Sequence, residues 1–292
     1  MNELVTIAQL RVVLEDLRCD GGNVGLVPTM GFLHAGHASL IERAAAENSL
    51  VVTTRFVNPL QFAPGEDLAS YPRDHDRDAA ICEAAGCNVL FSPDVDEMYP
   101  TPVVTTVSVS ALSQVMEGAS RPTHFDGVAT VVAKLFSIVG GCRAYFGEKD
   151  YQQLAVIRAM TADLSMPVAV IGCPIVREPD GLALSSRNIY LTDEERTAAP
   201  VLNRALRQGA AAIVAGETDA DVVRGLMTEV IGAEPIAALD YVEVADPNTL
   251  ERLDRCDDNA RLLGAVRFGR ARLIDNIPAV ERPWRPGLRL GS

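Results

Sequence analysis

Short apolar runs alternate with helical patterns between residues 24 and 173, and this alternation limits the possible folds more than any other feature of the sequence. The runs at 24–29, 50–54, 88–91, 144–147 and 167–173 have the length and apolar content of buried strands. Segments with apolar residues at helical spacing separate them, at 36–47, 73–85, 127–139 and 151–164. Strands and helices in alternation predict an α/β fold, in which a parallel sheet has helices on both faces and ligands bind at the carboxyl ends of its strands.

The pattern changes near residue 176. A turn at 178–181 is followed by Ala-rich helical segments around 193–214 and 219–232, and then by strand-like runs at 240–244 and 261–266. We therefore expect two domains, a parallel-sheet domain at 1–176 and a smaller α+β domain at 177–292. The last residues, 282–292, are expected to form a loose tail.

Composition and charge exclude several classes of protein. The net charge of −13 repels phosphate backbones, so nucleic acid is not an expected partner. No apolar run is long enough to cross a bilayer, and the N-terminus lacks the basic and apolar regions of a signal peptide. None of the six cysteines forms a Cys-x-x-Cys pair, and we expect them to be small buried hydrophobic residues. These features predict a cytoplasmic protein without a membrane partner.

Two of the four histidines, His34 and His37, stand three residues apart where the first predicted strand gives way to a helix. A helix N-terminus offers free N–H groups and the positive end of a dipole, which suits phosphate. Gly31 and Gly36 allow a ligand close to the backbone. Two other interpretations stay open: surface histidines on a loop, or a zinc pair, although neither His-Glu-x-x-His nor added cysteines accompany them.

Three further polar segments could share a ligand with the histidines. Asn58 and Gln61 follow the strand at 50–54, Lys149 and Asp150 follow the strand at 144–147, and the segment 185–188, Ser-Ser-Arg-Asn, lies just past the expected domain boundary. Taken singly, each has a plainer interpretation: an Asn-Pro turn, a charge pair at a helix start, and a turn before a helix. Together they predict a phosphate-binding site, because carboxyl ends of parallel strands meet at one sheet edge.

The ordered set of these segments resembles the pantothenate synthetase family. The match runs through 28–37, 56–62, 71–73, 124–132, 146–153 and 177–188, with further similarity at 239–244 and 274–277. The His-x-Gly-His element alone is shared with nucleotidyltransferases and class I tRNA synthetases, so the ordered set is the more specific signal.

The resemblance implies a Rossmann-like domain with a C-terminal lid. It implies that pantoate, β-alanine and ATP give pantothenate, AMP and pyrophosphate, in the pathway to coenzyme A. The pantoate carboxylate would attack the α-phosphorus, and the β-alanine amine would then attack the acyl carbon of pantoyl adenylate. Magnesium and a homodimer are also implied. A nucleotidyltransferase with the same His-x-Gly-His element, and a non-catalytic nucleotide-binding protein, remain as alternatives.

Residue roles follow from the same resemblance. His34, His37, Lys149, Ser185, Ser186 and Arg187 would be catalytic, with His37 as a proton donor. The ATP site would be lined by Met30, Gly31, Phe32, Leu33, His34, Ala35, Gly36, His37, Gly147, Glu148, Lys149, Asp150, Val176, Leu184, Ser185, Ser186 and Arg187, with adenine at the Val176 backbone. Pantoate would meet Gln61 and Gln153, whose neutral amides suit hydroxyls and a carboxylate. Asn58, Met30, Tyr71 and His124 would complete the substrate site.

Two positions depart from the family pattern. Arg55 stands where an apolar residue is usual, and Thr123 stands where glycine is common before His124. We expect either residue to alter the wall of the site and so the affinity for substrate, rather than the chemistry.

Overall fold

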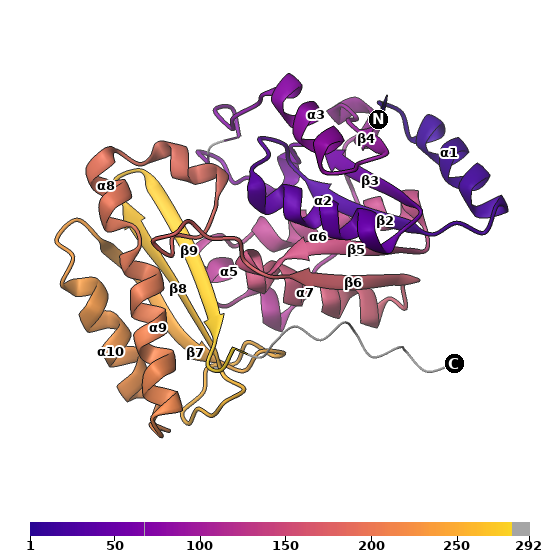
Figure 1. Ribbon diagram of the computed structural model, residues 1–292. Helices are drawn as coiled ribbons and strands as arrows, with labels where there is room; N and C mark the ends of the chain where they lie inside the picture. Colours follow the sequence, from indigo (N-terminus) through magenta and orange to yellow (C-terminus); the bar gives the residue numbers. More distant parts are fainter. Residues whose placement is uncertain (67, 282–292) are drawn as a thin grey trace. The chain divides into compact units, whose positions relative to one another are not determined.

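A six-stranded parallel sheet organises the first of two units into which the chain divides, Met1–Ile189 and Tyr190–Ser292 (Figure 1). The computed structural model describes residues 1–66 and 68–281. The strand order is β1-β4-β3-β2-β5-β6. The strands are β1 (Asn2–Leu4), β2 (Val24–Thr29), β3 (Leu50–Arg55), β4 (Val89–Phe91), β5 (Cys142–Gly147) and β6 (Val168–Cys173). The predicted parallel sheet is therefore confirmed.

Helices cover both faces of this sheet, as predicted. They are α1 (Ile7–Cys19), α2 (Ala35–Glu47), α3 (His75–Ala84), α4 (Val95–Met98), α5 (Glu117–Ser120), α6 (His124–Val139) and α7 (Tyr151–Asp163), with short 3-10 turns η1 (Pro59–Gln61), η2 (Ala111–Ser113), η3 (Glu148–Asp150) and η4 (Ser186–Tyr190). Helices α2 and α3 pack together on one face, whereas α6 and α7 pack together on the other (Figure 1).

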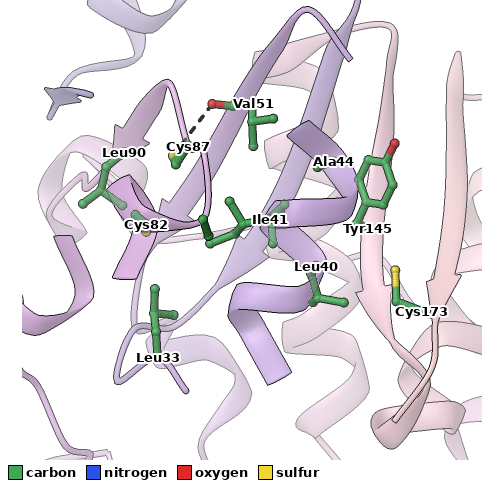
Figure 2. Packing of buried hydrophobic residues seen from close by; sticks show 12 residues of the cluster. Leu33, Leu40, Ile41, Ala44, Val51, Cys82, Cys87, Leu90, Tyr145 and Cys173 are labelled. Carbon is green, nitrogen blue, oxygen red and sulfur yellow. Dashed lines mark hydrogen bonds between the residues drawn. The ribbon is translucent and has the colours of Figure 1, made fainter. Parts of the chain in front are cut away.

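The core under α2 fixes the direction in which this helix leaves β2. Leu40, Ile41 and Ala44 lie on its buried face and pack on side chains from neighbouring strands and from α3, among them Tyr145 (Figure 2). Leu33, just before the helix, is buried in the same cluster (Figure 2). Full burial of a side chain of this size stabilises a fold by about 1.5–3 kcal/mol. The segment between β2 and α2 is thus held at both ends.

The second unit combines three helices with an antiparallel sheet, β7-β8-β9, which confirms the predicted α+β class. Its elements are α8 (Asp193–Ala198), α9 (Val201–Val214), α10 (Ala220–Gly232), β7 (Ala238–Ala245), β8 (Arg261–Phe268) and β9 (Ala271–Pro278). The helical segment expected around 193–214 is two helices, because Pro200, at the N-cap of α9, has no N–H to continue α8.

The division between the units falls after Ile189, later in the chain than the expected boundary at 176/177. Residues 177–189 bond to earlier parts of the first unit. The Leu184 N–H donates to the Val176 carbonyl over 3.0 Å, and the Ser186 hydroxyl donates to the Phe32 carbonyl over 3.3 Å. That residues 177–189 act together with a lid stays a prediction. The tail expected at 282–292 lies outside the described residues.

Two further expectations concern the surface and the membrane. Four of the six cysteines are buried, but Cys19 is exposed and Cys142 is partly exposed, so the prediction of burial is wrong for these two. Cys19 is the last residue of α1, and its side chain is exposed at that end of the helix. Among the described residues, no helix has the length and the apolar content needed to span a bilayer.

Candidate active site

The predicted site residues gather where the strand order of the parallel sheet reverses. From β2 the chain continues through α2 to β3 on one side, whereas from β5 it continues through α7 to β6 on the other. Such a switch point leaves an opening at the carboxyl ends of the two central strands, where ligands of α/β sheets bind. The segments 30–37 and 147–150 follow β2 and β5 directly, so the sheet brings both to this edge.

His34 and His37 cap the N-terminus of α2 with their own side chains. The His34 Nδ1 atom accepts the Gly36 N–H over 3.1 Å, and the His37 Nδ1 atom accepts the His34 N–H over 3.3 Å. The ring centroids lie 4.1 Å apart. Because each Nδ1 accepts a hydrogen bond from a backbone N–H, the neutral ring carries its own proton on Nε2. Both imidazoles can therefore donate an Nε2–H bond to a ligand.

Burial keeps both imidazoles uncharged at neutral pH. It lowers the pKa of His34 from 6.5 to about 4, with the Lys149 ammonium as the next cause. Burial likewise lowers the pKa of His37 to about 3, with His34 as the next cause. The expectation of free helix N–H groups is wrong at Gly36, because its N–H already bonds to His34. Donation at this helix end thus passes to the imidazole Nε2–H groups.

Lys149 and Asp150 form the opposite part of the site, in η3 just after β5. The Lys149 Nζ lies 3.5 Å from an Asp150 carboxylate oxygen, and the Lys149 side chain is largely buried. Burial raises the pKa of Asp150, but the Lys149 ammonium and the Arg187 guanidinium outweigh that effect and leave the pKa below its ordinary value. Asp150 is therefore an anion beside two cations. Glu148, from the same turn, lies beside Gly172 of β6.

The side chains of Asn58 and Gln61 form a buried hydrogen-bonded pair, called here the amide relay, beside Met30 at the end of β2. The Asn58 Nδ2 donates to the Gln61 Oε1 over 3.2 Å and to the Gly127 carbonyl over 3.0 Å. The Tyr99 hydroxyl donates to the Asn58 Oδ1 over 2.9 Å, a contact that the sequence reasoning missed. The Gln61 Nε2 lies 3.1 Å from the Met30 sulfur, so Gln61 adjoins the first residue after β2.

His124 lies beside this relay and presents the opposite hydrogen-bonding character from the histidine pair. Its Nδ1 lies 3.1 Å from the Gln61 carbonyl, which can only accept, so Nδ1 carries the proton and Nε2 is an acceptor. Burial, followed by the Arg121 guanidinium, lowers the pKa of His124 to about 4. Thr123, the unusual residue before it, has φ −100° and ψ −5°, a conformation that does not require glycine.

Ser185, Ser186 and Arg187 lie against the histidine segment. Besides the bond from Ser186 to the Phe32 carbonyl, the Arg187 N–H donates to the Ser185 hydroxyl over 3.3 Å. A Cβ atom on Gly36 would lie 4.0 Å from the Leu184 Cβ, so the two segments are in contact range. The structure thus brings the serine–arginine segment, residues 185–187, against residues 32–36 within one unit.

Other predicted residues lie at the margin of this group. Tyr71 is buried with its ring packed edge-on against Phe62, at 6.0 Å between centroids. Gln153 is half-buried in the first turn of α7. Its neighbour Gln152, which was given no role, bonds to the Leu112 and Val115 carbonyls over 2.8 and 2.7 Å. Gln152 therefore fixes the segment before α5.

Arg55, the other departure from the family pattern, packs against Gly31 in the segment between β2 and α2. A Cβ atom on Gly31 would lie 3.0 Å from the Arg55 Cγ, and the Arg55 guanidinium bonds to Glu3 over 3.1 Å. Asp78 of α3 also reaches this segment from behind and was missed by the sequence reasoning. A buried aspartate in a helix carries no local pattern that could have indicated its partner.

The arrangement suits chemistry at a phosphate. Two neutral Nε2–H donors and the Lys149 ammonium can stabilise charge that develops on phosphate oxygens, and the Gln61 relay can hold a second reactant beside Met30. Within the part of the chain that the structure describes, no three or more His, Cys, Asp or Glu side chains gather into a possible metal site.

Comparison with known proteins gives a consistent result. The sequence model of the family described as Pantoate-beta-alanine ligase matches residues 3–278. Pantothenate synthetase of Roseiflexus sp. (strain RS-1) is 55% identical over 276 residues, which cover 94% of this chain and 98% of that protein. A crystal structure of pantothenate synthetase from Thermus thermophilus is 50% identical, with a TM-score of 0.91, and covers 96% of this chain and 100% of its own.

A further solved structure is relevant for its ligands. It is pantoate-beta-alanine ligase from Francisella tularensis, complexed with beta-gamma ATP and beta-alanine. It is 32% identical to this chain, with a TM-score of 0.77, and covers 97% of this chain and 100% of its own.

Proposed function

The chain belongs to the pantoate-beta-alanine ligase family, and from this premise we propose how its residues divide the work of the reaction. The activity itself is the ligation of pantoate to β-alanine with ATP as a substrate. Two chemical steps are proposed. A pantoate carboxylate oxygen attacks the α-phosphorus and pyrophosphate leaves; the β-alanine amine then attacks the acyl carbon of pantoyl adenylate and AMP leaves.

The histidine pair and Lys149 are proposed to act in the first step. The Nε2–H groups of His34 and His37 would donate to phosphate oxygens, and the Lys149 ammonium would stabilise the charge that builds on the α-phosphate. With pKa values of about 4 and 3, the two imidazoles are neutral at pH 7 and act as hydrogen-bond donors. This modifies the expected role of His37, from supplying a proton to donating a hydrogen bond.

The remaining ATP contacts are proposed from the segments that follow β2 and β5. The backbone from Met30 to His37 and the turn from Gly147 to Asp150 would enclose the phosphates and the ribose, and the Val176 N–H would meet adenine. Ser185, Ser186 and Arg187 would close over the triphosphate. The bond from the Ser186 hydroxyl to the Phe32 carbonyl supports this, because it holds residue 186 against the segment between β2 and α2.

Pantoate is proposed to bind between the amide relay and His124. The Gln61 Oε1 already accepts a bond from Asn58, so its Nε2–H group is the one to offer to pantoate oxygens. The His124 Nε2 would accept from a pantoate hydroxyl. Gln153 and Tyr71 would complete the site. The contact between Gln61 and Met30 carries the proposal, because the Gln61 amide, which would hold the carboxylate, adjoins the residues that would bind ATP.

Magnesium is proposed to enter with ATP. Mg²⁺ usually keeps several waters and takes substrate phosphates plus one or two carboxylates as ligands, so a dedicated protein cage is not required. Asp150, a partly exposed anion next to Lys149, is the carboxylate that would share the ion. When bound, the ion would neutralise phosphate charge. The homodimer, the lid action of the C-terminal unit and the cytoplasmic location stay predictions.

Isotope transfer tests the adenylate step directly. Pantoate with an ¹⁸O-labelled carboxylate should transfer one labelled oxygen to AMP, because that oxygen bridges the acyl carbon and the phosphorus. AMP release should require both pantoate and β-alanine. Unlabelled AMP would rule out the adenylate. A nucleotide that stays attached to the final product would favour a nucleotidyltransferase, and ATP binding without turnover would favour a non-catalytic protein.

A further inference from the structure

The segment between β2 and α2 has an unusual backbone that needs external support. Gly31 and Phe32, two consecutive residues, have φ values of +84° and +50°. Glycine adopts this left-handed region freely, but an aromatic residue does so only where its surroundings hold it there. The path of these residues determines how His34 enters the cap of α2, so whatever holds Phe32 also places the imidazoles.

Asp78 of α3 supplies that support through both of its carboxylate oxygens. Oδ2 accepts the Phe32 N–H over 2.9 Å, and Oδ1 accepts the Leu33 N–H over 2.7 Å. The side chain is almost completely buried, with 1% of its surface exposed. Hydrogen bonds to a buried carboxylate are short and strong, and two consecutive N–H groups form a natural anion site. Here the anion is a side chain of the protein.

Neighbouring contacts limit the movement of the segment in other directions. The Arg77 guanidinium lies 5.0 Å from the centroid of the Phe32 ring. A Cβ atom on Gly31 would lie 2.9 Å from the Asp78 Oδ2, so glycine is needed for this close approach. Because the Phe32 carbonyl accepts from Ser186, a shift of Phe32 would also move the serine–arginine segment.

We propose that Asp78 is a positioning residue for the adenylation step: it holds Phe32 and Leu33 so that the imidazoles of His34 and His37 and the Ser186 segment face the triphosphate. The inference rests on the proposed function, in which residues 30–37 bind ATP. Asp78 acts through the backbone of that segment and does not itself touch a substrate, because its side chain is almost completely buried and is directed to the Phe32 and Leu33 N–H groups.

Asp78→Asn tests this with little change in side-chain size. An amide offers one acceptor oxygen in place of two, and its NH₂ group would face a backbone N–H. We expect the single-turnover rate of pyrophosphate release from ATP and pantoate to fall by about 10- to 100-fold, the scale of a misplacement of about 1 Å. The KM for ATP should rise. Aminolysis of supplied pantoyl adenylate by β-alanine should stay within about twofold of wild type, because it needs no triphosphate.

Two further variants separate positioning from general damage. Asp76→Asn removes the same charge from an exposed position on the same helix and should leave both half-reactions unchanged. Gly31→Ala disturbs the contact between residue 31 and the Asp78 carboxylate while Asp78 itself is intact. It should slow pyrophosphate release and spare aminolysis, and it gives this test even if Asp78→Asn does not fold. In the double variant Asp78→Asn/Gly31→Ala, the rate of pyrophosphate release should fall by less than the product of the two separate fold-decreases, because both changes displace the same segment.

Equal losses in both half-reactions, or losses that multiply in the combined variant, would overturn the inference. So would an adenylation rate near wild type in Asp78→Asn. Failure of the proposed function differs from failure of this inference, because it would appear in the wild-type chain, as pyrophosphate release that does not depend on pantoate.

Discussion

Replacement of His37 by asparagine should separate the two tasks of its imidazole. The Nδ1 atom accepts the His34 N–H over 3.3 Å and so caps α2, whereas the Nε2–H group is proposed to donate to phosphate. An asparagine Oδ1 occupies the place of Nδ1 and keeps the cap, but no atom of that side chain reaches the place of Nε2. His37→Ala, by contrast, removes both the capping acceptor and the Nε2–H donor.

Both variants should slow adenylation to a similar extent, and only His37→Ala should also lose stability. Loss of one donor to charge that develops in the transition state costs about 10²- to 10³-fold, or about 2.7–4 kcal/mol, so His37→Asn should slow adenylation on that scale. Loss of a capping acceptor costs about 1 kcal/mol. For a unit of this size, that is a fall in Tm of about 2–4 °C, and we expect it for His37→Ala but not for His37→Asn.

The assay is single-turnover release of pyrophosphate from ATP and pantoate without β-alanine, with thermal unfolding measured on the same samples. A near-normal rate for His37→Asn, together with a slow His37→Ala, would refute the proposal. It would show that the imidazole contributes only as a helix cap and that its Nε2–H group does not contact phosphate.

Lys149→Ala should slow the same step by at least about 100-fold, whereas His75→Ala, whose exposed imidazole lies 3.3 Å from Glu3, should be close to silent; equal losses would indicate misfolding. In Gly127→Ala, the new Cβ atom would lie 2.3 Å from the Leu60 carbonyl oxygen and 2.6 Å from the Gln61 Cα, so steady-state assays should show a raised KM for pantoate and an unchanged KM for ATP. A parallel rise in both constants would contradict the assignment of Gln61. Acid should destabilise the fold, because the pKa values of His34 and His37, about 4 and 3, lie below the 6.5 of the unfolded chain. Between those values the unfolded state binds more protons, so the free energy of unfolding should fall as the pH drops from about 6.5 to about 4. Urea denaturation at pH 7 and pH 5 measures this fall, and a variant with both histidines replaced by asparagine should show less of it; an unchanged fall would assign it to other groups.

Local patterns predicted the elements that carry strong periodicity or turn chemistry. The strands from β2 to β6 and the helices α2, α3, α6 and α7 occur within a few residues of the expected ranges. Helix α1 was missed, although Thr6 and Gln9 form a reciprocal capping box that its sequence shows. Strand β1 has only three residues and pairs at the edge of the sheet, so nothing local distinguishes it from a loop.

In the candidate site, too, some features could be predicted from local sequence and others could not. That polar segments follow strand ends could be predicted from the sequence, because parallel strands bring their carboxyl ends to one edge. The supporting contacts could not be predicted. Asp78 bonds to residues 45 and 46 positions away, and the Tyr99 hydroxyl reaches Asn58 across 41 positions. No spacing rule connects residues so far apart in the chain.

The sequence by itself determined that His34 and His37 lie at a strand-to-helix transition beside glycine, and that this transition suits phosphate. Only the tertiary structure decided how the two imidazoles are used. Their Nδ1 atoms accept backbone N–H groups, and burial lowers both pKa values, so each ring is left as a neutral Nε2–H donor. The physical reason is that the tautomer and the charge of an imidazole depend on the groups packed around it. The N–H groups that set the tautomers are only two and three residues away, at the start of α2. The groups that bury the rings and lower their pKa values, Lys149 among them, come from distant parts of the chain, and only folding brings them together.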